Sequence, residues 1–171
     1  MTIRPPRIVA LLAMLVVSMT TMNAADAHDE DNFDVEGSLG WTATEKQSGH
    51  DQVLAMTAIR RLSAINDGLN ELAQRDGTAC NWMNQITGPE TLAKQVSAFD
   101  ANPWVKGVIE GAGMTVKEYL LTLHAVSEAA VTVHAAERQI EVTVRASPTN
   151  VAFYRQHRSE IERLLDGPDP C

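Results

Sequence analysis

Two helices and the corner between them are specified by residues 102–133, NPWVKGVIEGAGMTVKEYLLTLHAVSEAAVTV. Asn102 is a preferred N-cap residue, and Pro103 suits the first helical position because the N–H that proline lacks would have no partner there. Gly111-Ala112-Gly113 supplies the left-handed backbone with which helices commonly end. The first part of the segment therefore predicts a short helix that begins at Pro103 and stops at the glycines.

A second helix is expected directly after this corner. Thr115 and Glu118 have the spacing of a capping box, and Met114 and Tyr119 have that of the hydrophobic staple that accompanies it. The helix behind them carries a broad apolar face, formed by Tyr119, Leu120, Leu123, Val126, Ala130 and Val133. Such a face is typical of a helix at the centre of a bundle, so we expect the other helices to pack against it.

Three further segments have the pattern of helices. One long amphipathic helix is predicted from Asp51 to Asp76, and shorter helices are expected to open at Thr87-Gly88-Pro89-Glu90 and at Ser147-Pro148. The segment Ile140–Arg145 alternates like a strand, but a single strand without a partner cannot form a sheet, so we expect an extended connector there. The apolar positions of the long helix are Val53, Met56, Ile59, Leu62, Ile65, Leu69 and Leu72.

The first 27 residues have the three parts of a secretory signal peptide. Arg4 and Arg7 form its basic region, Ile8–Met19 is apolar, and Ala25-Asp26-Ala27 is a small-residue cleavage site. The apolar run is shorter than the ~20 residues that cross a bilayer. We therefore expect a periplasmic or secreted protein without a stable membrane anchor; a retained signal anchor is the alternative.

Residues 28–49 are acidic and then rich in glycine, serine and threonine, which predicts a flexible leader. Their aspartates do not match the alternating ligand positions of a calcium-binding loop. The expected fold is all-α: a single, bundle-like domain of four or five helices over residues 50–171. It would follow a cleaved signal peptide, 1–27, and the flexible acidic leader.

The charge of the chain limits its partners. The formal net charge is −8, and removal of residues 1–27, which carry two arginines and one aspartate, makes it −9. Such a surface repels nucleic acid and anionic lipid headgroups. We therefore expect a basic protein partner or a small apolar ligand, and no nucleic acid.

Cys80 and Cys171 both remain after the predicted cleavage. An even number of cysteines in an oxidising compartment favours a disulfide. A loop of about 90 residues closed in this way would stabilise the fold by about 4–5 kcal/mol in the chain-entropy model. Two free thiols, or a bond between molecules through Cys171, are the alternatives.

Two histidines of the central helix have a carboxylate within one turn, His124 with Glu128 and His134 with Glu137. The histidines would lie about 15 Å apart along the helix and so cannot share a metal ion. Each pair supplies two ligands, whereas zinc or iron sites usually have three or four. We expect partly exposed histidines beside carboxylates, with no cofactor or metal; His157 is a further group that the fold can bring to either pair.

A cofactor is nevertheless the first alternative, because helical bundles can hold haem or a metal between side chains of facing helices. His124 would bind it together with a glutamate or with a methionine. The candidate methionines are Met56, Met83 and Met114. No C-x-x-C-H attachment motif is present, and methionines at helical spacing usually fill a core.

No sequence motif of a hydrolase is present, since G-x-S-x-G, H-E-x-x-H and serine–lysine patterns are all absent. An enzyme of unknown type is therefore the third hypothesis. Aromatic and imidazole side chains could instead line a groove for an apolar ligand or a partner's helix, although ordinary core packing also accounts for them. The residues of this possible binding surface are Trp104, Tyr119, His124 and Tyr154.

Several short motifs resemble those of uncharacterised small secreted α-helical proteins of Gram-negative bacteria. The resemblance covers the C-terminal half and implies a periplasmic helical domain; it implies nothing about catalysis and carries over no site residues. The absence of enzyme motifs and the acidic charge favour a non-catalytic periplasmic binding or interaction module: an adaptor, an inhibitor or immunity-type partner, or a carrier of a small apolar ligand. The motifs are Asn102-Pro103, Ala112-Gly113-Met114-Thr115, Lys117-Glu118-Tyr119, Asn150-Val151-Ala152-Phe153 and Glu160-Ile161.

Overall fold

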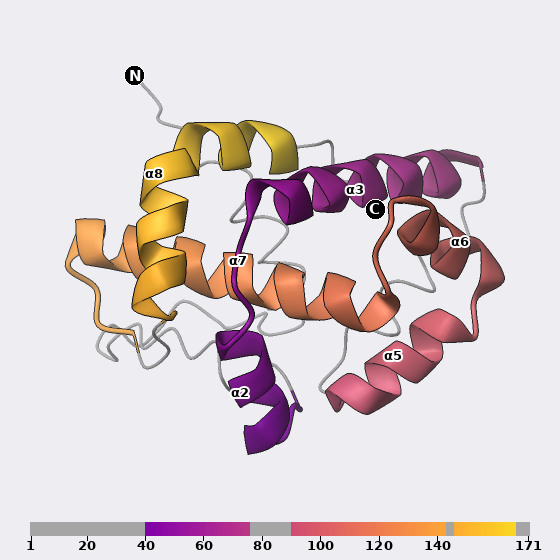
Figure 1. The fold of residues 1–171 in the computed structure, drawn as a ribbon, viewed down its shortest axis with the longest axis horizontal. Helices are drawn as coiled ribbons and strands as arrows, with labels where there is room; N and C mark the ends of the chain where they lie inside the picture. The colour runs from indigo at the N-terminus through magenta and orange to yellow at the C-terminus, as the bar shows by residue number, and fades with distance from the viewer. Residues whose placement is uncertain (1–39, 76–89, 143–145, 167–171) are drawn as a thin grey trace, which may run out of the picture.

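The computed structural model describes residues 40–75, 90–142 and 146–166, which form an all-α packed domain (Figure 1). Within these residues there are six helices and no strand. The predicted all-α class is confirmed, whereas the expected number of four or five helices is too low. The predicted signal peptide and residues 28–39 of the predicted leader lie outside the described residues.

The additional helix is α2 (Ala43–His50), which lies in the predicted leader except for its last residue. Its N-terminus is a capping box, in which the Thr42 hydroxyl accepts a hydrogen bond from the Glu45 N–H and the Glu45 carboxylate accepts one from the Thr42 N–H at 2.8 Å. Trp41 beside it is buried. The packed domain therefore begins before the predicted boundary at residue 50, because local capping and one aromatic anchor outweigh the polar composition of this segment.

The predicted helix Asp51–Asp76 begins later than expected, since α3 spans Met56–Arg75. Residues 52–55 are not helical because the buried side chain of Asn150 binds their backbone. Its Oδ1 accepts from the Leu54 N–H at 3.0 Å, and its Nδ2 donates to the Gln52 carbonyl at 2.8 Å. Val53, which the periodicity placed on the apolar face, is 67% exposed as a result.

The corner between the next helices is confirmed in detail. Helix α5 (Leu92–Asp100) leads into α6 (Pro103–Gly111), whose first two N–H groups donate to the Asn102 side chain. Gly113 has the predicted left-handed backbone, with φ of +82°. Thr115 and Glu118 form the predicted capping box, and both residues of the predicted staple, Met114 and Tyr119, are buried.

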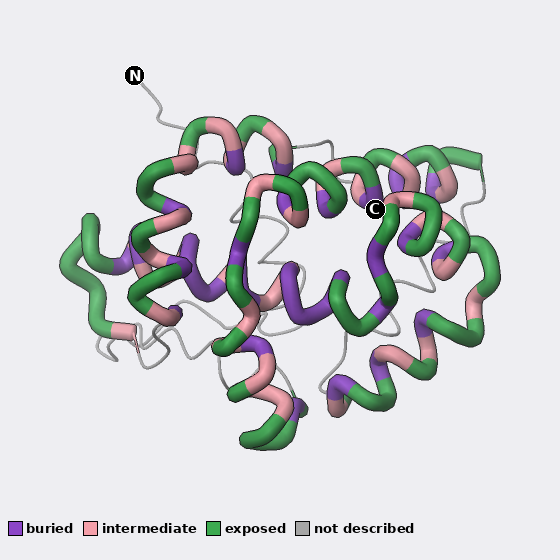
Figure 2. The backbone as a smooth tube through the Cα atoms, in the orientation of Figure 1, coloured by how far each residue is buried: buried purple, intermediate pink, exposed green. Residues whose placement is uncertain are grey.

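Helix α7 (Val116–Arg138) is the centre of the domain and contacts each of the other five described helices. Buried positions account for 12 of its 23 residues, and Figure 2 shows them recurring along its length. The prediction of a central helix is therefore confirmed.

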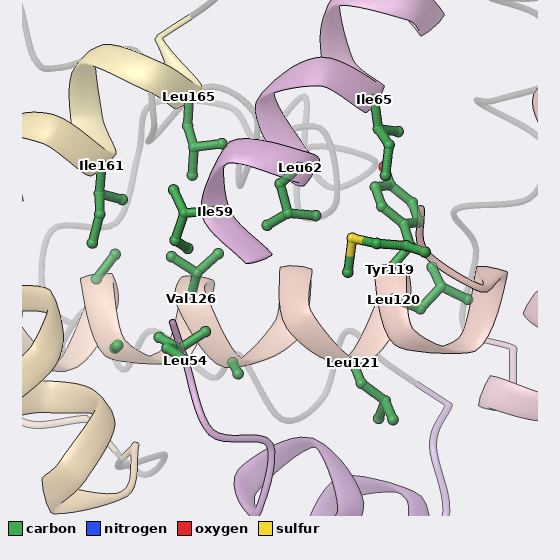
Figure 3. Close-up of a cluster of buried hydrophobic side chains, with 14 of the residues drawn as sticks. Leu54, Ile59, Leu62, Ile65, Tyr119, Leu120, Leu121, Val126, Ile161 and Leu165 are labelled. Carbon is green, nitrogen blue, oxygen red and sulfur yellow. The ribbon is translucent and has the colours of Figure 1, made fainter. Parts of the chain in front are cut away.

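Helix α8 (Pro148–Leu165) packs along α7 and α3 and completes the main core. Figure 3 shows Ile59 of α3 above Val126 of α7, with Ile161 and Leu165 of α8 beside them. Ala125 and Ala129 of α7 are fully buried, and their small side chains let the neighbouring helices approach closely.

The connector between α7 and α8 begins at Gln139, which adopts a left-handed conformation at the end of α7. Residues 140–142 are neither helix nor strand, and 143–145 lie outside the described residues. Among the described helices, none is long and apolar enough to span a membrane.

Candidate functional site

Three features stand out against the ordinary core: a buried imidazole beneath α2, a polar cluster between α7 and α8, and an exposed tryptophan on α6. The first is formed around His124, whose side chain is only 10% exposed. The Trp41 ring lies on it, with 4.7 Å between ring centroids, and the Trp41 indole N–H donates to Oε1 of the buried Gln95 at 3.0 Å. Gly49 of α2 also lies directly against the imidazole. Trp41, which precedes α2, and Gly49 of α2 thus cover a histidine of α7, and Gln95 of α5 holds the Trp41 ring in place.

The acidic partner of His124 is Glu128, one turn further along α7. Nε2 of the imidazole lies 3.2 Å from the carboxylate, which is 8% exposed. The contact does not have the geometry of a hydrogen bond, and Nε2 is buried without a hydrogen-bond partner. No group of three or more histidine, cysteine, aspartate or glutamate side chains within the described part of the chain is placed to hold a metal ion. Here His124 and Glu128 supply two ligands, fewer than metal sites usually have.

The contact between α2 and the imidazole gives a first testable prediction. A Cβ at Gly49 would lie 2.3 Å from Cδ2 of His124 and 3.3 Å from the Trp41 ring. We therefore expect Gly49→Ala to lower the free energy of unfolding by about 1–3 kcal/mol, as overpacking does. Glycine-to-alanine replacement inside a helix ordinarily stabilises it, by about 0.5–1 kcal/mol.

The matched control is Gly107→Ala in α6, where nothing lies within 4 Å of the added Cβ. Urea unfolding should show the control to be slightly more stable than the wild type and Gly49→Ala to be less stable. Stabilisation by both substitutions would show that α2 does not sit on His124 in solution.

The second feature joins the end of α7 to the middle of α8. Arg158 donates through Nε to Glu162 at 2.7 Å, through Nη1 to Glu137 at 2.6 Å, and through Nη2 towards Nδ1 of His134 at 3.2 Å. Nε2 of His134 lies 3.7 Å from the Glu162 carboxylate and has no hydrogen-bond partner. The Tyr154 hydroxyl donates to Glu162 at 3.4 Å. One guanidinium thus holds two carboxylates and one imidazole.

The surroundings of this cluster shift the pKa values of three of its side chains. Burial lowers the pKa of His134, and the neighbouring Arg158 lowers it further, against the opposing effect of Glu162 and Glu137. The hydrogen bond to Glu162 raises the pKa of Arg158 above its already high value. Burial raises the pKa of Tyr154, with the Glu162 charge adding to the effect. At neutral pH the cluster therefore holds a neutral imidazole, a charged guanidinium and a neutral phenol.

The third feature is Trp104 on α6, which is 76% exposed. Of the four residues predicted to form a binding surface, it alone is fully at the surface. Tyr119 and Tyr154 are core residues, and burial raises the pKa of Tyr119 to about 12. His124 lies beneath Trp41. The structure therefore does not bring the four residues together.

Sequence spacing identified both histidine–carboxylate pairs but not their surroundings. Helix α8 contributes Arg158, Glu162 and Tyr154 to the surroundings of His134; the ring of His157 instead lies against Phe153 of its own helix, at 4.8 Å between centroids. No local pattern marks Arg158, because its role depends on how two distant segments pack. Met83, Cys80 and Cys171, and with the cysteines the predicted disulfide, lie outside the described residues.

Comparison of the chain with models of known families, with curated proteins and with solved structures gives no match. The fold defines the protein as an all-α packed helical domain, and any function must be argued from its own residues. The resemblance to secreted helical proteins of Gram-negative bacteria stays a prediction.

Proposed function

We propose that this protein is a non-catalytic interaction module of the periplasm, which binds a basic protein partner through α6. The observation that carries the proposal is the exposure of Trp104, 76% of which faces solvent. Tryptophan is among the residues most enriched at the energetic centres of protein interfaces, where it buries a large apolar area and is costly to truncate. An indole left in water on a rigid helix is a feature that a partner's surface would stabilise.

The helix holds the backbone of Trp104 in a fixed position. The backbone N–H of Trp104 donates to the Asn102 side chain at 3.2 Å. On the opposite side of α6, Val105 and Ile109 are buried in the core. An anchor on a capped and packed helix loses less conformational freedom on binding than one on a mobile loop.

The surroundings of the tryptophan leave room for a partner. Gly107 and Gly111 follow it at spacings of three and seven residues, which places all three on one side of α6; we call them the Trp104 face. No atom lies within 4 Å of a Cβ added to either glycine. A partner's backbone can therefore approach this side of the helix closely.

Charge favours a basic partner. The chain carries a formal net charge of −8, and Lys106, the cation of α6, is already paired with Asp100 at 3.0 Å and Glu110 at 3.7 Å. Opposite charge on a partner would speed association and help to set specificity. The complex should weaken as salt rises from about 0.1 M to 1 M, because the Debye length then falls from about 10 Å to about 3 Å.

Replacement of Trp104 by alanine tests the proposal. We expect the unfolding free energy to change by less than about 0.5 kcal/mol, as for other surface substitutions. Affinity for the partner should fall at least tenfold, since interface anchors contribute about 2 kcal/mol or more. The measurement is photo-crosslinking from position 111 in cells, followed by titration of the captured partner against purified wild type and variant.

The matched control is Val53→Ala, because Val53 is likewise a solvent-facing apolar side chain, 67% exposed, but precedes α3. It should bind the partner like the wild type. The proposal is wrong if Trp104→Ala binds as tightly as the control, or if the complex is insensitive to salt.

A further inference from the structure

The polar contacts between α7 and α8 among the described residues gather at a single cluster. Arg158 of α8 is the centre of this cluster. It contacts Glu137 and His134 on α7, and it also contacts Glu162 on its own helix. From the geometry of this cluster we infer that His134 and Arg158 form an acid-released latch between the two helices. In neutral solution the latch is closed, and a proton on His134 opens it.

The closed state requires an unprotonated nitrogen at His134. Nη2 of Arg158 can only donate, so Nδ1 of the imidazole, 3.2 Å away, must accept. Protonation turns both ring nitrogens into donors. The contact between Nδ1 and the guanidinium then joins two cations with no acceptor between them, and that hydrogen bond is lost.

The proton also changes the competition for the two carboxylates. Glu137 lies 3.7 Å from Nδ1 of His134, and Glu162 lies 3.7 Å from Nε2. Both are the acceptors that Arg158 uses when the imidazole is neutral. A charged His134 therefore competes with Arg158 for the same two partners. The Arg158 side chain is 32% exposed, so it can exchange these partners for water without crossing the core.

The other groups around the imidazole determine which state is favoured. Arg158 of α8 and Arg138 of α7 oppose a positive charge on His134, and so does the burial of the ring. Glu162 of α8 and Glu137 of α7 favour it, while the Tyr154 ring packs edge-on against the imidazole, with 6.3 Å between centroids. Because burial is the largest effect and the pKa of His134 is lowered, the balance favours the neutral, closed state.

The direction of the pH dependence follows. Since the folded protein holds a proton on His134 less tightly than the unfolded chain does, the contribution of this residue to stability is complete above the unfolded pKa of about 6.5. It decreases as the pH falls through that value towards the lower folded pKa. Each pH unit between the two values corresponds to about a tenfold loss in the ratio of folded to unfolded protein.

The latch is tested on the purified protein by NMR titration from pH 7.5 to 5.0. We expect the imidazole of His134 to titrate with a midpoint below 6.5, and the Nε–H signal of Arg158 to shift or broaden with the same midpoint. In His134→Gln, which keeps a neutral polar side chain, the Arg158 signal should stay unchanged over this range. The matched control is His157→Gln on α8, which should behave like the wild type.

A second variant separates the latch from simple burial of the imidazole. In Arg158→Gln the two carboxylates remain while the cation is gone, so the titration midpoint of His134 should rise. A midpoint that is unchanged or lower would overturn the inference. An Arg158 signal that does not respond while His134 of the wild type titrates would also overturn it, and this second result does not depend on the folding of any variant.

Discussion

Replacement of Asn150 by alanine is expected to lower the free energy of unfolding by about 2–5 kcal/mol. Its side chain is 2% exposed and forms hydrogen bonds with two backbone groups of the segment between α2 and α3, the Leu54 N–H and the Gln52 carbonyl. Alanine leaves both groups without their partner. A buried donor or acceptor that loses its partner costs about 1–3 kcal/mol.

The effect can be separated from that of ordinary helix capping. Ser147 is the N-cap of α8, and its hydroxyl accepts from the Asn150 N–H at 3.3 Å. Ser147→Ala should cost only about 1 kcal/mol. Urea unfolding of the two variants side by side provides the measurement. If Asn150→Ala costs no more than Ser147→Ala, the side chain of Asn150 does not tie the two segments together.

The contrast between these two residues shows where prediction from the sequence succeeds. The helix start at Ser147-Pro148 and the corner from Asn102 to Tyr119 are encoded by residues within one turn of each other, so the pattern is visible in the sequence itself. The hydrogen bonds of Asn150 reach residues 96 and 98 positions away. No periodicity in a single sequence encodes such a contact, and the start of α3 was predicted wrongly for that reason.

The candidate sites show the same difference between local patterns, which the sequence reveals, and contacts between distant residues, which it does not. The pairing of His124 with Glu128 and of His134 with Glu137 follows from helical spacing, which brings residues three and four apart onto one side. The groups that surround these histidines, Trp41 at His124 and Arg158 at His134, come from other elements. Helix α2 differs: its capping box of Thr42 and Glu45 is local and visible in the sequence, yet the polar composition around it led to the prediction of a flexible leader.

Among substitutions in the core, we expect Ile59→Ala to have the largest effect: it should lower the free energy of unfolding by about 2–5 kcal/mol. Ile59 is fully buried and lies between Val126 of α7 and Leu165 of α8 (Figure 3). Truncation to alanine removes the transfer free energy of the lost carbon atoms and leaves a cavity where three helices meet. That junction collapses only in part, because each of its helices is also held by other contacts.

Val53→Ala is the informative comparison, because Val53 and Ile59 both belong to the three-to-four-residue periodicity that predicted one helix from Asp51. If that helix existed, both side chains would face the core and both truncations would be costly. In the structure Val53 precedes α3 and is 67% exposed, so its truncation should change stability by less than about 0.5 kcal/mol. Urea unfolding of the two variants thus decides where α3 begins: similar, large losses for both would contradict the structure, whereas a loss confined to Ile59→Ala supports the non-helical segment that Asn150 holds.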